Sequence, residues 1–202
     1  MSKDARLRLI VVAVFAVFIV ALVLASVNRR APVADISNVP LPTGAIEMAD
    51  RDIPGLLSFN VPSNEHTDQP VNYPQVPPVG GPHYPVWQNC GVYTDPIHNE
   101  FAVHSLEHGA VWITYQPDLD AGEVARLAAI TMQSHYRILS PYPGLPTPIV
   151  ISAWGYQLRL ATADDARLAA FIARFESGPT TPERGASCTG GVEQTAKELG
   201  IR

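Results

Sequence analysis

The 202-residue sequence is poor in charged side chains and short of basic ones. Charged residues make up 16% of it, against roughly 25% in typical soluble domains. Beyond Arg30, nine Lys and Arg residues face eighteen Asp and Glu residues. Nucleic acids and anionic membrane surfaces attract basic proteins. This acidic excess therefore excludes nucleic acid as the expected main partner and favours a cation or a basic protein.

Several motifs and residue types that would define a function are also missing. Only Met48 and Met132 lie beyond the N-terminal region, which disfavours a copper(I) site built from thioethers. The sequence contains no G-x-x-x-x-G-K-[ST] pattern and no G-x-S-x-G pattern. A phosphate-binding loop and a serine hydrolase consequently have no support.

A long apolar run occupies residues 9–27, which carry no charged side chain. As a helix it would extend about 28 Å, enough to cross a bilayer. Basic residues flank it on both sides: Lys3, Arg6, Arg8, Arg29 and Arg30. We predict a transmembrane anchor over residues 1–30, single-pass in the cell membrane, with the C-terminal part outside the cytoplasm. A cleaved signal peptide is the alternative, with a cleavage site at Val23-Leu24-Ala25.

The positions of the prolines and cysteines indicate how the chain is organised after residue 30. Prolines without an apolar period predict a linker over residues 31–56, followed by an extracytoplasmic domain over residues 57–202. Thiols oxidise outside the cytoplasm, so Cys90 and Cys188 are expected to form a disulfide. The alternatives are two unpaired cysteines, or Cys90 as a metal ligand.

The apolar periodicities of the domain predict an α+β fold. Residues 109–115, 149–154 and 156–160 have the composition of strands. Asp120 begins a capping-box pattern before a helix over residues 121–135, and a second helix runs to about Glu176. We expect a small sheet with these two helices covering one face.

The least ordinary feature is a group of histidines. Five of the six fall within 43 residues, inside an interval over residues 52–125 that contains no Lys or Arg: His66, His83, His98, His104 and His108. Neutral imidazoles bind a cation through their lone pairs, whereas protonated imidazoles repel one another.

The segment from His104 to Gly109 carries the densest part of that group. If Asn99 caps a short helix that ends at Gly109, His104 and His108 lie one turn apart with Glu107 beside them. We predict a transition-metal site, copper or zinc, that joins these three residues to His83, with Glu107 as ligand or orienting group. His98 is a further candidate ligand.

Two other interpretations of the same residues stay open. The letters H-x-x-E-H match those of inverted zinc peptidases, in which Glu107 would act as general base of a zinc-dependent hydrolase. Alternatively, the histidines are structural, Glu107 holds one imidazole by its ring N–H, and the protein is a metal-free module whose acidic surface meets an envelope protein.

Three motifs lie around the histidines: Pro77-Pro78-Val79-Gly80-Gly81-Pro82-His83, Cys90-Gly91-Val92-Tyr93 and Val103-His104-Ser105-Leu106-Glu107-His108-Gly109. Together they resemble a bacterial family known as domain of unknown function 3105. The likeness covers about residues 57–188 and implies a membrane-anchored or exported protein, but no activity. Gly80 departs from it, because the resemblance leads us to expect Ser there.

Overall fold

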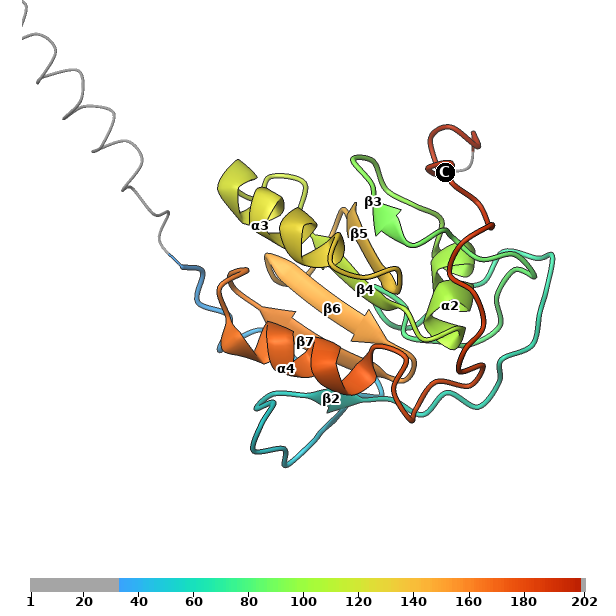
Figure 1. Cartoon of the computed structure of the whole chain (residues 1–202). Coiled ribbons are helices and arrows are strands. Elements are labelled where there is room, and N and C mark those ends of the chain that lie inside the picture. Colours follow the sequence, from blue (N-terminus) through green and yellow to red (C-terminus); the bar gives the residue numbers. More distant parts are fainter. Residues whose placement is uncertain (1–32, 201–202) are drawn as a thin grey trace, which may run out of the picture. The chain divides into compact units, whose positions relative to one another are not determined.

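The structure is a computed structural model that describes residues 33–200 (Figure 1). The predicted anchor over residues 1–30 lies outside the described residues. Within residues 33–200, no helix is both long enough and apolar enough to cross a bilayer.

A mixed seven-stranded sheet and three helices make up the described part of the chain, as expected for an α+β fold. The helices are α2 (Asn99–Glu107), α3 (Ala121–Thr131) and α4 (Ala166–Phe175). The strands are β1 (Ile46–Glu47), β2 (Leu57–Ser58), β3 (Gly91–Val92), β4 (Val111–Tyr115), β5 (Arg137–Pro141), β6 (Ile149–Ala153) and β7 (Tyr156–Leu160). Their order across the sheet is β1-β2-β7-β6-β4-β5-β3.

The central strands of the sheet pair both with strands next to them in the sequence and with strands farther along the chain. Strands β6 and β7 form an antiparallel hairpin, and β6 also pairs antiparallel with β4. Strand β5 runs parallel to β4, which requires the crossover that α3 supplies. The sequence periodicity predicts β4, β6 and β7 correctly. It misses β5 and extends α3 four residues too far, to His135. Strand β5 begins shortly after the helix and ends where a proline-rich stretch starts, so its own apolar pattern is too short to be recognised.

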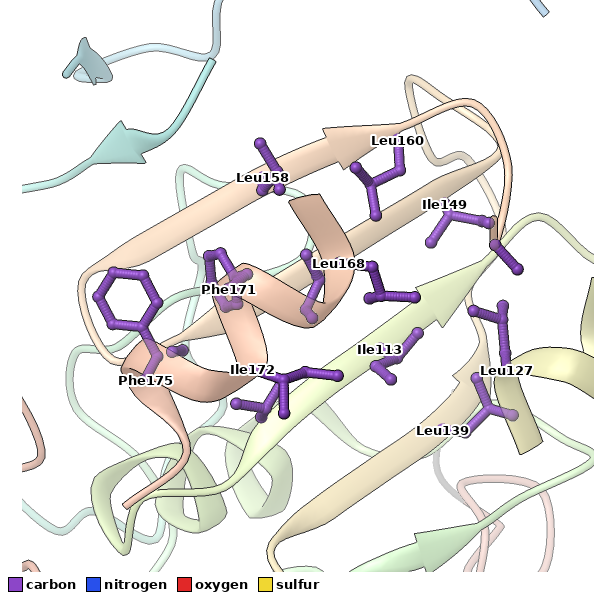
Figure 2. Packing of buried hydrophobic residues seen from close by; sticks show 14 of the residues in the cluster. Ile113, Leu127, Leu139, Ile149, Leu158, Leu160, Leu168, Phe171, Ile172 and Phe175 are labelled. Carbon is purple, nitrogen blue, oxygen red and sulfur yellow. The ribbon is translucent and has the colours of Figure 1, made fainter. Parts of the chain in front are cut away.

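Helices α3 and α4 pack on one face of the sheet, which confirms that part of the sequence prediction (Figure 1). Figure 2 shows Phe171 and Leu168 of α4 lying over strands β4, β6 and β7, with Leu127 of α3 beside Leu139. Full burial stabilises each such side chain by about 1.5–3 kcal/mol. This apolar face is the principal core of the domain.

The opposite face of the sheet carries α2 and part of the C-terminal segment. Leu106 of α2 packs against Trp112 and Ile138, in the same cluster as Cys188. A disulfide joins Cys90 to Cys188, with 5.4 Å between their Cα atoms, and confirms the predicted pairing. The bond fixes residues near Cys188 beside α2.

The packed domain extends upstream of Leu57, where the sequence leads us to expect its start. Ile53 and Leu56 are buried in the core with α4, and β1 at Ile46–Glu47 pairs with β2. The latter part of the expected linker, residues 31–56, therefore contributes both a strand and core side chains.

Removal of the disulfide tests its contribution to stability. Closing a loop between residues 98 positions apart stabilises the folded state by about 4.7 kcal/mol in the chain-entropy model. We expect the double variant Cys90→Ser/Cys188→Ser to lose about that much free energy of unfolding in urea titrations. A reducing agent should destabilise the wild type but leave the variant unchanged; equal stability of the two oxidised proteins would contradict this prediction.

A second prediction concerns the N-terminus of α4. Asp165 caps the helix by accepting a hydrogen bond from the backbone N–H of Arg167, and its carboxylate pairs with the Arg167 guanidinium. This guanidinium lowers the pKa of Asp165. A carboxyl with a lowered folded-state pKa stabilises the protein above its unfolded pKa, and the stabilisation disappears as the pH falls through the folded value.

We therefore expect Asp165→Asn, which keeps a capping oxygen but removes the charge, to destabilise the protein at pH 7 more than at about pH 3. Urea midpoints at both pH values measure the difference. Asp118→Asn, at an exposed position on another loop, is the matched control. An Asp165→Asn effect of equal size at both pH values would contradict the expectation.

Candidate metal centre

Helix α2 presents polar side chains to the interior of the domain. Glu100, His104, Ser105 and Glu107 are all buried on it. The helix is capped at His98 without a side-chain hydrogen bond, so the expected cap at Asn99 is wrong by one residue. It ends at Glu107 with His108 as its C-cap, and Gly109 follows the cap as expected, with a φ of +100° that is accessible mainly to glycine. These boundaries place His104 and His108 four residues apart, at the C-terminal end of the helix.

A short parallel bridge brings His66 beside His83. The backbone N–H of Thr67 donates to the carbonyl of His83 at 2.8 Å, and the N–H of His83 donates to the carbonyl of Glu65 at 3.0 Å. Residues paired in this way direct their side chains to the same side. The bridge therefore adds His66 to the site although it is 17 residues from His83 in the sequence.

Four potential ligand atoms converge where this bridge meets α2. They belong to His66, His83, His104 and Glu107 and lie within 4.8 Å of one another. The His66 ring stacks on the His104 ring, with centroids 4.8 Å apart, and the His83 ring meets both of them edge-on. His83, His104 and Glu107 are buried, whereas the His66 side chain is 46% exposed.

Glu107 is held by groups on both of its oxygens. Asn64 donates from Nδ2 to Oε1 at 2.6 Å, and Oε2 lies 2.9 Å from His83 Nε2 and 3.7 Å from His66 Nε2. Both oxygens thus have polar neighbours. This arrangement suits a metal ligand or an ion-pair partner better than a general base waiting for water.

His108 lies at the other side of His104. The two Nε2 atoms are 3.0 Å apart, and the Nε2 of His108 is also 3.5 Å from Glu183 Oε2. Trp87 packs against both rings. His108 is therefore not one of the group of four but contacts it at His104.

Backbone carbonyls define which nitrogen of each buried imidazole carries hydrogen. The Nδ1 atoms of His83, His104 and His108 lie 2.8, 2.6 and 2.6 Å from the carbonyl oxygens of Gly81, Tyr84 and Ser187. A carbonyl oxygen only accepts hydrogen bonds, so each Nδ1 is the donor. In the neutral rings each Nε2 then carries a lone pair, which is the arrangement typical of metal-binding histidines.

The environment of His104 opposes protonation of its ring. Burial, and to a smaller extent the neighbouring imidazoles of His108, His83 and His66, lower the pKa of His104 to about 4, although the Tyr84 carbonyl raises it. The His104 ring is consequently neutral near pH 7. Its Nε2 lone pair is available to a cation.

The structure brings together most of the residues singled out from the sequence. His83, His104 and Glu107 belong to the group of four, and His108 contacts His104. His98 does not join them, because its Nδ1 faces Glu100 Oε2 at 2.7 Å. His66 was visible in the sequence as part of the histidine group, but no local pattern connects it to His83.

Gly80, the departure from the resemblance, lies just before His83. Its φ is +148°, and an added Cβ would lie 2.9 Å from Val61 Cγ1. A serine side chain at this position would therefore meet Val61 in this chain. The backbone here approaches its neighbours closely, which helps to fix the loop that carries His83.

These features define a disulfide-bonded α+β domain with a buried histidine–glutamate cluster. The sequence profile of a family described as a protein of unknown function, DUF3105, matches residues 65–190, and the chain belongs to this family. The matched region contains every residue of the cluster except the supporting Asn64. No curated protein and no solved structure matches the chain.

Proposed function

We propose that the protein binds a transition-metal ion, zinc or copper, through His66, His83, His104 and Glu107. His108 is the adjoining donor that completes or supports this set. The observation that carries the proposal is the pair of Nε2 atoms of His104 and His108, 3.0 Å apart, with both Nδ1 atoms already donating to carbonyls. Two facing lone pairs repel each other unless a proton or a metal ion lies between them, and the burial of both rings disfavours the charged imidazolium that the proton would create.

The metal-free alternative accounts for only part of the cluster. A protonated His83 paired with the Glu107 carboxylate would explain their separation of 2.9 Å. For His104 and His108, the same explanation would require one of two buried rings to be protonated and to donate to the other. Among the described residues, the carboxylate nearest to this pair of Nε2 atoms is that of Glu183, 3.5 Å from His108. The two buried imidazoles therefore favour a bound cation over a purely structural network.

The donor types favour zinc or copper(II) over other ions. Imidazole nitrogens suit both metals, whereas magnesium and calcium prefer sites made of oxygen ligands. The two cysteines are joined in a disulfide and are not available as thiolate ligands. With zinc–ligand bonds of about 2.0 Å, neighbouring ligand atoms of a tetrahedral site lie about 3.3 Å apart. Within the group of four, the separations of 2.9 Å and 3.7 Å bracket this value, and all four atoms lie within 4.8 Å of one another.

The cellular location follows from separate features of the chain. Residues 9–27 form an apolar run long enough for a membrane anchor, and the Cys90–Cys188 disulfide is typical of an oxidising compartment. We propose that the domain lies outside the cytoplasm, attached to the cell membrane. There it would encounter metal ions that enter or leave the cell envelope.

Metal analysis of the full-length chain tests the proposed function. Protein purified without a polyhistidine tag, exposed to zinc or copper(II) and separated from free metal, is expected to retain one ion per chain. His104→Ala/His108→Ala should retain less than a tenth of that amount, because two anchored donors are lost. His135→Ala is the matched control, since His135 is exposed in the turn between α3 and β5, and it should behave like the wild type.

A second measurement covers the case in which the double variant folds poorly. Binding to the folded state alone should stabilise the wild type against urea by about 2.7 kcal/mol at a metal concentration 100 times the dissociation constant. Negligible metal in the wild type, together with unchanged stability on metal addition and chelation, would contradict the proposal and favour the metal-free interaction module.

Reporter fusions test the proposed location. Alkaline phosphatase, which needs disulfides, should be active when fused to the C-terminus of the full-length chain, while a green fluorescent reporter exported by the same route should remain dark. Deleting residues 1–30 should reverse both results, because the apolar run is removed. An active fluorescent fusion and an inactive phosphatase fusion of the full-length chain would place the domain in the cytoplasm instead.

A further inference from the structure

The four donors of the candidate metal centre are anchored unequally. His83 and His104 are buried, and a backbone carbonyl fixes the Nδ1 atom of each. Glu107 is also buried and is held by Asn64. His66 differs in both respects: its side chain is 46% exposed, and its Nε2 lies 3.7 Å from Glu107 Oε2, beyond hydrogen-bond distance.

The backbone that carries His66 is nevertheless fixed. The bridge to His83 holds residues 65–67 through two backbone hydrogen bonds. Asn64 ties the same segment to Glu107 at 2.6 Å. Rotation of the His66 side chain can therefore expose or cover the site without moving the chain around it.

The His66 ring is also the part of the group that solvent reaches most readily. It stacks on His104 with an angle of 18° between the rings, and it is the one exposed member of the group of four. An ion bound by the buried donors would be reached most directly by displacing this ring. Glu65 and Asp68 flank this part of the chain, and the interval over residues 52–125 lacks Lys and Arg, so an approaching cation meets no nearby positive charge from this segment.

We propose that His66 is the exchangeable ligand through which a divalent transition-metal ion enters and leaves the site. The proposal rests on the proposed metal-binding function and adds to it a transfer role. The buried donors hold the ion, and the His66 imidazole is replaced by an imidazole or carboxylate of the molecule that delivers or accepts it. The protein is then a metal-transfer protein rather than one that keeps its ion as a permanent structural element.

Zinc transfer from the full-length protein to a chromogenic chelator in excess tests this proposal. The wild type, His66→Ala, His83→Ala and His135→Ala are loaded with zinc, separated from free metal and mixed rapidly with the chelator. We expect His66→Ala to retain one zinc ion per chain but to release it at least tenfold faster than the wild type, since removing even a group that only orients a ligand costs about 10–100-fold in metal affinity. His83→Ala should retain no zinc, and His135→Ala should match the wild type.

The outcomes separate this inference from the proposed function. A release rate of His66→Ala equal to that of the wild type, or loss of zinc as complete as in His83→Ala, would overturn the exchange role while leaving metal binding intact. Glu183→Gln provides a second comparison, because the Glu183 side chain is 51% exposed and lies near His108. Faster release from Glu183→Gln alone would place the exit at Glu183 and overturn the role of His66. A wild type that binds no zinc would overturn both proposals.

Discussion

The candidate metal centre depends on three hydrogen bonds from imidazole to backbone. A neutral imidazole has one N–H donor and one lone pair, so fixing the donor also fixes the direction of the lone pair. The carbonyls that accept these bonds belong to Gly81 and Tyr84, on one loop, and to Ser187, near the C-terminus. The orientation of the three Nε2 atoms is therefore set by the folded backbone alone.

The two faces of the sheet divide stability and function between them. Helices α3 and α4 bury apolar side chains on one face, and little there is polar. The other face accepts the buried polar residues of α2 together with the C-terminal segment. Cys188 follows directly after Ser187, whose carbonyl holds His108. The disulfide thus fixes the backbone next to one of the site's anchoring groups, although it contributes no ligand.

Sequence patterns a few residues long correctly predicted the strands and the helix that such patterns define. Alternating and continuous apolar runs identified β4, β6 and β7, and the acidic cap identified α3, because these signals lie within a few residues of one another. The four-residue spacing likewise predicted that His104 and His108 meet. Strand β5 and His66 escaped prediction for the same physical reason: each is placed by pairing with a distant parallel segment, and such pairing leaves no periodic trace in the sequence.

The free-energy cost of burying the imidazoles of His104 and His108 favours a functional role for them. A buried acceptor without a donor costs about 1–3 kcal/mol. When both rings are neutral, the facing Nε2 atoms of His104 and His108 are such acceptors, because both ring hydrogens lie on Nδ1. Apolar residues at these positions would extend the core around Leu106 and Trp112 without that cost. A fold that instead buries both imidazoles, anchors their donors and directs their lone pairs at each other retains an unfavourable contact that a metal ion would relieve. Sites of this kind, where local energetics oppose stability, are where function is expected.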